Sequence, residues 1–285
     1  MIFRSAIRYF KNKKTFYSKN KKIVKYLKST KNSEYITIAN SILKHRFSNN
    51  FIPYIYIYIN HKNKIKVFKN NSGFKYVLHN NKKLYFPEKY SNRRIKRCYL
   101  NLVNEQNENS PHSYSLRTLK KSDIILDLGG AEGIWTLTNI DAIFHSYIFE
   151  CDKKWIKPLQ LTFAPYKDKV TIVEKFVSDR NSDEFITIDK YCYDNNISPN
   201  VIKADIEGYE PLMLKGCTQI LNKAKTDFIL CTYHKQNDGK DIENIIKNYP
   251  RYQFKYTKGY MLCWWFDRIF EKPYLRKGVI YIYHK

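Results

Sequence analysis

The segment VIKADIEGYEPLMLKG, residues 201–216, concentrates three carboxylates just after an apolar run. Asp205 and Glu207 follow residues 201–204, which we expect to form a buried strand, and Glu210 comes next at the start of a helix. Carboxylates crowded at one end of a strand are costly unless a positive charge balances them. The spacing therefore predicts a site for a cation: a sulfonium, a bound metal ion or a paired base.

A glycine-rich loop follows an earlier apolar run in DIILDLGGAEG, residues 123–133. Loops that bind dinucleotides have the spacing G-x-G-x-x-G, which Gly129, Gly130 and Gly133 do not match. The remaining pattern, D-x-G-x-x-x-G, suits a ligand that lacks phosphate and carries an ammonium and a sulfonium group. We therefore expect S-adenosylmethionine, with Asp127 accepting a hydrogen bond from the ammonium and the glycines letting the backbone approach the ligand.

Further polar residues follow the next two apolar runs. Glu150, in SYIFECD, is placed to accept hydrogen bonds from both ribose hydroxyls, although NAD sites use the same device. Ser178 and Asp179, in VSD, lie where the adenine base is expected if the strands are ordered in this way, and a plain turn is the alternative. Glu150 thus supports an adenosyl ligand without deciding between the two cofactors.

Methylation of a hydroxyl also requires a group that removes its proton. His234, which ends the run FILCTYH, is the first candidate for this general base, and Asp205 either orients the methyl donor or acts as the base itself. His112 in SPHSY is a rival. A divalent metal held by Asp205, Glu207 and His234 would acidify the hydroxyl instead, but nothing in the sequence requires one. Four residues are expected to contact substrate or cover the site: His112, Tyr114, Glu210 and Tyr233.

These stretches also carry a family resemblance. DLGGAEG, FECD, VIKADIEGYEPLMLKG and CTYH resemble FkbM-type S-adenosylmethionine-dependent methyltransferases, whose hallmark is similar to D-x-E-G-x-E-x-x-x-L-K-G. The run EQNENSPHSY, residues 105–114, resembles a subgroup of that family, and the resemblance covers about residues 100–285. It implies a Rossmann-like fold and methyl transfer to a hydroxyl of a sugar or natural product. Tyr209 stands where the hallmark more often has a small residue, and it narrows the expected pocket beside Glu210.

The elements that must position these residues follow from the hydrophobic pattern. From residue 123 onward, five apolar runs alternate with segments of helical length, which predicts an α/β fold with a mostly parallel, doubly wound sheet. Two further runs at the C-terminus predict an antiparallel hairpin at one edge, which is typical of class I methyltransferase sheets. Turn-rich strands over residues 51–90 predict a small antiparallel meander. We expect three parts: a basic, partly helical arm (1–50), the meander with a cap segment (51–115) and a methyltransferase domain (116–285).

Charge is distributed unevenly along the 285 residues. The net charge is +25, and residues 1–100 hold 25 Lys or Arg against two acids. This asymmetry favours an anionic partner such as nucleic acid, an acidic glycan or a membrane surface. The other explanation is a bias of the whole composition toward lysine.

The alternative functions are an RNA ribose O-methyltransferase, a non-catalytic adaptor for membranes or glycolipid, and, last, a nicotinamide oxidoreductase. The segment D-I-E-G replaces the N/D-P-P-Y/F motif of base-methylating enzymes, so we do not expect methylation of nucleic-acid bases.

Cysteine usage and hydropathy set the expected location. The six cysteines are scattered without a C-x-x-C pair, which indicates a reducing compartment and no zinc site. No apolar run approaches the roughly 18 residues of a spanning helix, and the N-terminus lacks the apolar core of a signal peptide. We expect a cytoplasmic protein that can attach to the inner face of a membrane through its basic end. Its acceptor is expected to be a small molecule or glycan, anionic or lipid-linked, and not nucleic acid. The sequence leaves the oligomeric state open.

Overall fold

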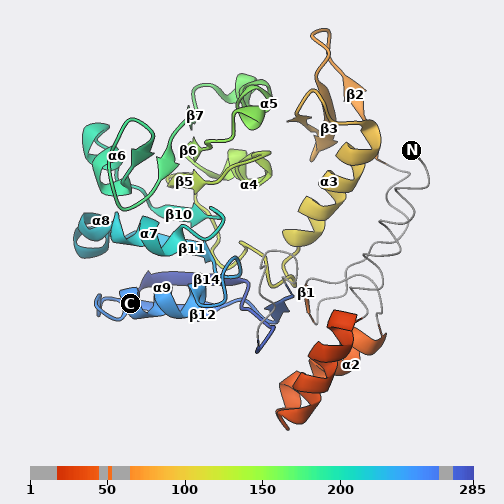
Figure 1. Ribbon diagram of the computed structural model, residues 1–285. Coiled ribbons are helices and arrows are strands. Elements are labelled where there is room, and N and C mark those ends of the chain that lie inside the picture. The colour runs from red at the N-terminus through yellow and green to blue at the C-terminus, as the bar shows by residue number, and fades with distance from the viewer. Residues whose placement is uncertain (1–17, 45–50, 53–64, 263–271) are drawn as a thin grey trace.

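A seven-stranded sheet forms the centre of the chain (Figure 1). The computed structural model describes residues 18–44, 51–52, 65–262 and 272–285. From one edge of the sheet to the other the strands are β12 (Tyr252–Tyr256), β14 (Val279–His284), β11 (Asp227–Cys231), β10 (Val201–Ala204), β5 (Ile124–Leu128), β6 (His145–Phe149) and β7 (Val170–Val173).

The strand order confirms the predicted fold class. β10 pairs in parallel with both β11 and β5, and the parallel pairing continues through β6 to β7. β14 is antiparallel to both of its neighbours, β11 and β12, so the C-terminal pair forms the expected antiparallel edge. The order of strands along the chain reverses between β5 and β10, and ligand crevices of open α/β sheets lie outside the carboxyl ends of strands at such a point.

Helices cover both faces of the sheet, which explains why its strands read as continuous apolar runs. Ile125 packs into the hydrophobic cluster on one face, with α4 and α5, whereas Leu126 and Leu128 pack into the cluster on the other. The helices of the domain are α4 (Ile134–Asn139), α5 (Lys153–Phe163), α6 (Ile188–Asp194), α7 (Glu210–Lys215), α8 (Thr218–Lys223) and α9 (Asp238–Ile246), with 3₁₀ turns η1 (Ile140–Ala142) and η2 (Ala164–Tyr166).

A small antiparallel sheet precedes the main domain. It contains β2 (Phe68–Lys69), β3 (Lys75–His79) and β4 (Lys82–Phe86), and α3 (Asn92–Glu105) follows it. Figure 1 shows α3 beneath this sheet and beside α4. The predicted meander is wrong at its first strand, because β1 (Phe51–Ile52) pairs instead with β13 (Tyr260–Met261) near the C-terminus. The rest of the Tyr/Ile alternation lies outside the described residues. In the main domain, β8 (Phe176–Val177) and β9 (Phe185–Ile186) form a separate parallel pair.

Part of the basic arm folds against the C-terminal region. A helix over residues 18–29 and α2 (Ser33–Lys44) bury Ile23, Leu27 and Ile38 against Leu262 and Leu275. The helical character expected for the arm is therefore present from residue 18, and residues 1–17 lie outside the described part. Among the helices of the described ranges, none combines the length and apolarity that crossing a bilayer requires.

Candidate functional site

A cleft of about 290 Å³ opens at the carboxyl ends of β5, β6 and β10, where the strand order reverses. This is near the lower end of the roughly 300–1,000 Å³ of ligand pockets. Three residues expected to bind the cofactor, Gly129, Glu150 and Asp205, line it, and so does Glu207, which was expected to be catalytic. Tyr209, which the sequence analysis expected to narrow the pocket, also lines the cleft, whereas Trp155 and Phe176 were not identified from the sequence.

The loop glycines have different structural reasons to be small. Gly129 has φ +73°, and a Cβ there would lie 2.0 Å from the backbone oxygen of Asp205, so this loop passes directly against the end of β10. A Cβ on Gly130 would meet Ile148, and one on Gly133 would meet Phe163. Gly130 and Gly133 do not line the cleft, so their size serves packing of the loop and of α4.

Asp127 lies beneath the loop, not in the cleft. It is 1% exposed, its Oδ1 is 2.9 Å from the Nζ of Lys203, and its Oδ2 accepts a hydrogen bond from Thr136 at 2.7 Å. Lys203 also donates to the backbone oxygen of Gly129 at 3.2 Å. In this arrangement Asp127 holds the lysine that supports the loop, whereas the sequence analysis expected it to contact the ligand's ammonium.

Glu150 sits at the end of β6, in the cleft wall. Its Oε2 accepts from the N–H of Ala131 at 2.8 Å, and its Oε1 accepts from the N–H of Asp152 at 2.7 Å. These bonds fix the carboxylate and link the loop after β5 to the loop after β6. Each oxygen retains a second acceptor site, which is what two ribose hydroxyls need.

Ser178 and Asp179 do not line the cleft. Ser178 is 2% exposed and donates to Asp179 at 3.2 Å. Instead, the two residues just before them, Phe176 and Val177 in β8, line the cleft. Phe176 is 47% exposed and gives this wall an apolar ring face.

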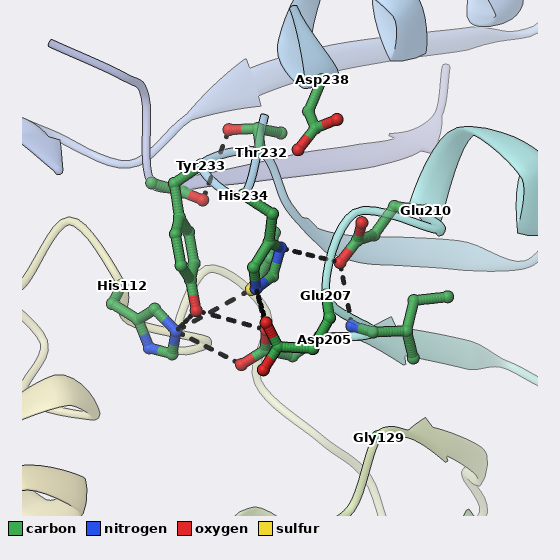
Figure 2. A network of polar contacts seen from close by, with 12 residues as sticks. His112, Gly129, Asp205, Glu207, Glu210, Thr232, Tyr233, His234 and Asp238 are labelled. Carbon is green, nitrogen blue, oxygen red and sulfur yellow. Dashed lines mark hydrogen bonds and ion pairs between the residues drawn. The ribbon is translucent and has the colours of Figure 1, made fainter. Parts of the chain in front are cut away.

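Four donors surround the carboxylate of Asp205, and Figure 2 shows three of them: His112, Tyr233 and His234. Oδ2 lies 2.9 Å from the hydroxyl of Tyr114 and 3.4 Å from Nε2 of His112. Oδ1 lies 3.2 Å from both the Tyr233 hydroxyl and Nε2 of His234. Burial alone would raise the pKa of Asp205, but the hydrogen bonds from the two histidines hold it well below its usual value. Asp205 is therefore a fixed negative charge, and a poor proton acceptor.

His234 is held between two carboxylates. Nε2 faces Asp205, and Nδ1 is 3.3 Å from Oε1 of Glu210, which is fully buried and also accepts from the N–H of Ile206. Burial would lower the pKa of His234, but these two carboxylates raise it to about 10. The ring therefore carries a proton on each nitrogen at neutral pH, which does not support the expectation that it is the general base.

Glu207 differs from its neighbours because its carboxylate is open to the cleft. Its side chain is 77% exposed, and its nearest ion-pair contact is Nε2 of His234 at 3.7 Å. Glu207 has φ +57° and is followed by Gly208 at +90°, a left-handed turn that is unfavourable for a residue with a side chain. Desolvation in the cleft, then the charges of Asp205 and Glu210, raise the pKa of Glu207, and His234 and, less strongly, Lys154 act against the rise.

Donor atoms at the predicted metal site also have partners within the protein. Asp205, Glu210 and His234 offer ligand atoms within 4.8 Å of one another, and so do His112, Asp205 and Cys231. The two nitrogens of His234 each face a carboxylate, so hydrogen bonds account for this cluster without an ion. Glu207, named in the sequence-based metal set, belongs to neither group among the described residues.

Sequence reasoning missed two further acids beside the loop, Glu132 and Glu105. Glu132 is 9% exposed, and the thiol of Cys98 in α3 donates to its Oε1 at 3.2 Å. Burial, with Glu105 and Glu150 nearby, raises the pKa of Glu132 to about 7. The sequence signals that could have found them were the acid within GGAEG and the acid that opens EQNENSPHSY.

Three of the four residues expected to contact substrate or cover the site are His112, Tyr114 and Tyr233. All three are buried around Asp205, and none of them lines the cleft.

No protein-family model and no curated protein matches the chain. In structure it is similar to S-adenosylmethionine-dependent methyltransferases. One is methyltransferase FkbM from Methylobacillus flagellatus KT, with 18% identity and a TM-score of 0.47 over 70% of this chain and 56% of that one. Another is an rRNA methylase from Streptococcus thermophilus, with 12% identity and a TM-score of 0.39 over 58% of this chain and 89% of that one.

A third similar structure is a candidate methyltransferase from Streptococcus mutans in complex with S-adenosylhomocysteine. The identity is 9% and the TM-score 0.40, over 59% of this chain and 91% of that one. The chain spans little more than half the length of the Methylobacillus protein. The fold follows from the strand order, and any function has to be argued from the residues of the cleft.

Proposed function

We propose that the protein is an S-adenosylmethionine-dependent O-methyltransferase. The observation that carries this proposal is the set of carboxylates in a cleft at the strand-order reversal: Glu150, Asp205 and Glu207. A nucleoside ligand with a positive charge fits such a wall, whereas a pyrophosphate would be repelled by it. The loop after β5 also lacks the glycine spacing that dinucleotides require.

The residues of the cleft fit the parts of this cofactor. Glu150 would accept hydrogen bonds from the ribose hydroxyls, and the half-exposed ring of Phe176 offers apolar surface for the adenine. Gly129 lets the loop lie against the end of β10, where Asp205 provides a fixed negative charge. When bound, S-adenosylmethionine supplies a methyl group activated by a sulfonium.

Glu207 is the proton acceptor that the geometry favours. Asp205 has four donors and a depressed pKa, and His234 is already protonated between two carboxylates. Glu207 faces the cleft, and its raised pKa makes it a better base than an ordinary carboxylate. We therefore assign removal of the acceptor's proton to Glu207 and orientation of the methyl donor to Asp205. His234 supplies a positive charge beside both carboxylates.

The acceptor is proposed to be a hydroxyl of a sugar or related natural product. The D-x-E-G-x-E motif supports this through its resemblance to FkbM-type enzymes, and this motif builds the turn that carries Glu207. The expected cytoplasmic location and attachment to a membrane stay predictions.

Calorimetric titration with S-adenosylhomocysteine and with NAD tests the proposal. We expect S-adenosylhomocysteine to bind and NAD not to bind. Glu150→Ala should weaken binding by about tenfold or more, because it removes a charged acceptor from the ribose. Glu108→Ala, at an exposed acid outside the cleft, is the matched control and should leave the affinity unchanged. Binding of NAD alone, or of neither compound, would refute the assignment.

A further inference from the structure

A strip of exposed cationic side chains extends from the cleft along two helices. It consists of Arg93, Arg94 and Arg97 on α3 and Lys153, Lys154 and Lys157 on α5, and we call these six residues the basic strip. All six are exposed. Lys154 also lines the cleft, so the basic strip begins at the wall of the candidate site.

An aromatic pair joins the two halves of the basic strip. The guanidinium of Arg94 lies 3.6 Å from the ring centre of Tyr90, and Tyr90 meets Trp155 edge-on with ring centres 5.9 Å apart. On the other side, Nζ of Lys154 lies 5.7 Å from the ring of Trp155. Three successive contacts therefore connect Arg94 to Lys154, and Trp155, the last ring in this series, lines the cleft.

The arginines of the strip are arranged in a way that costs helix stability. The run RRIKR places four cations in five residues in the N-terminal half of α3, and the first turn contains no acid. Positive charge is unfavourable at this end of a helix, and Arg93 and Arg97 form a like-charged i,i+4 pair. Within the described ranges, no carboxylate lies at ion-pair distance from Arg93, Arg94 or Arg97. A bound anion would offset this cost.

Charge is thus separated at the site. The interior of the cleft carries Glu150, Asp205 and Glu207, which suit a cationic cofactor. At the rim Lys154 pairs with Asp152, so the unbalanced positive charge of the basic strip lies beyond it, on the arginines of α3. We propose that the basic strip binds the phosphate of an acceptor that is a sugar phosphate or sugar diphosphate, while the sugar hydroxyl faces the cleft. This inference rests on the proposed function. The phosphate is shared by nucleotide-linked and lipid-linked sugars, so the recognised feature is the sugar–phosphate ester itself.

The alternative of an RNA acceptor fits the basic strip less well. Proteins that bind single-stranded nucleic acid offer exposed aromatic faces on which bases stack. Tyr90 is 8% exposed and Trp155 is 7% exposed, so both rings of the strip are covered. The strip therefore provides charge for phosphates without a stacking surface for bases.

Titrations of the full chain saturated with S-adenosylhomocysteine test the inference, with UDP-glucose, pyrophosphate, glucose and a twelve-nucleotide oligouridylate as probes. The variant is Arg94→Gln with Arg97→Gln. Its control, Lys21→Gln with Lys25→Gln, removes the same charge from exposed positions of the helix over residues 18–29. We expect UDP-glucose and pyrophosphate to bind, glucose not to bind, and the first variant alone to weaken binding about tenfold or more.

Equal weakening in both variants would show a general charge effect and overturn the proposal, as would unchanged affinity in the first variant. Tighter binding of oligouridylate than of UDP-glucose would replace the sugar phosphate with RNA. A lipid-linked saccharide diphosphate in detergent, added as a further arm, distinguishes the two sources of the phosphate. Affinity for S-adenosylhomocysteine, measured first in each variant, checks that the cleft is intact. If that ligand binds to no form of the chain, the proposed function fails, and anion binding is judged on the unloaded chain.

Discussion

Lys203 and Asp127 form an ion pair inside the protein, between neighbouring strands. Nζ and Oδ1 are 2.9 Å apart, and the side chains are 5% and 1% exposed. The two residues are partners in the register of β10 and β5. Burial acts to lower the pKa of Lys203, but Asp127 and then Asp205 raise it above its usual value, so the lysine stays charged. Because Lys203 also donates to the backbone oxygen of Gly129, the pair supports the loop after β5.

Removing one member of this pair is expected to be strongly destabilising. Lys203→Met leaves the carboxylate of Asp127 buried without its cation, which typically costs roughly 3–5 kcal/mol. Urea denaturation followed by circular dichroism measures the loss. The double variant Lys203→Met with Asp127→Leu should recover much of it, since no unpaired charge remains. A loss below about 1 kcal/mol in the single variant would mean that the pair contributes little.

Glu207→Gln should lower methyl transfer without affecting the cofactor. General bases contribute about 10²- to 10⁴-fold, and the amide keeps the size of the side chain. The measurement is formation of S-adenosylhomocysteine with an acceptor that supports turnover in a glycan screen, beside calorimetry with S-adenosylhomocysteine. Glu108→Gln is the control. Full turnover by Glu207→Gln would remove this residue from the mechanism and return attention to His112.

His234 is expected to stay protonated through neutral pH. Its folded pKa, raised to about 10, exceeds the value near 6.5 of an unfolded histidine. Its stabilising contribution is therefore fully present below about pH 6.5 and is lost as the pH rises through about 10. Unfolding free energies at several pH values should decline over this window and decline less in His234→Gln. Ring proton signals of His234 that titrate near pH 6.5 would show that Asp205 and Glu210 do not hold the ring in its protonated form.

Gly129→Ala tests the contact between the loop and the end of β10. The added Cβ would lie 2.0 Å from the backbone oxygen of Asp205, so the loop must move. Gly73→Ala is a matched control, because φ is +90° there and the nearest atom is a flexible lysine carbon at 3.7 Å. The control should lose about 1–2 kcal/mol, and Gly129→Ala should lose more and also bind S-adenosylhomocysteine more weakly. Equal losses and intact binding would show that the loop has room.

The sheet could be predicted because each buried strand is visible as an apolar run in its own stretch of sequence. Each apolar run must be buried on both faces, and this requirement is visible in strands such as residues 201–204 without knowledge of their neighbours. The placement of Asp127 depends on Lys203, which is far along the chain, so the sequence located its strand end but not its partner. Gly130 and Gly133 were predicted from their loop, whereas the side chains that require them to be small come from other elements.

Roles at the site were harder to predict than positions. The sequence located Asp205, Glu207 and His234, but it did not show that Glu210 lies behind His234 and fixes its charge. Nor could spacing show that Glu207 turns toward the cleft, since that depends on a left-handed backbone conformation. The pattern of residue types therefore pointed to strand ends that meet at the cleft, and hydrogen-bond geometry is what favours Glu207 over Asp205 and His234 as the proposed base.

The helix pair at the start of the described chain has a consequence for synthesis. Ile23, Leu27 and Ile38 are covered by Leu262 and Leu275, which are synthesised more than two hundred residues later. Their apolar surface stays uncovered during that interval, a state that favours aggregation. The dense positive charge around these helices keeps such nascent chains apart. The charge of the arm thus protects the chain before it has any ligand to bind.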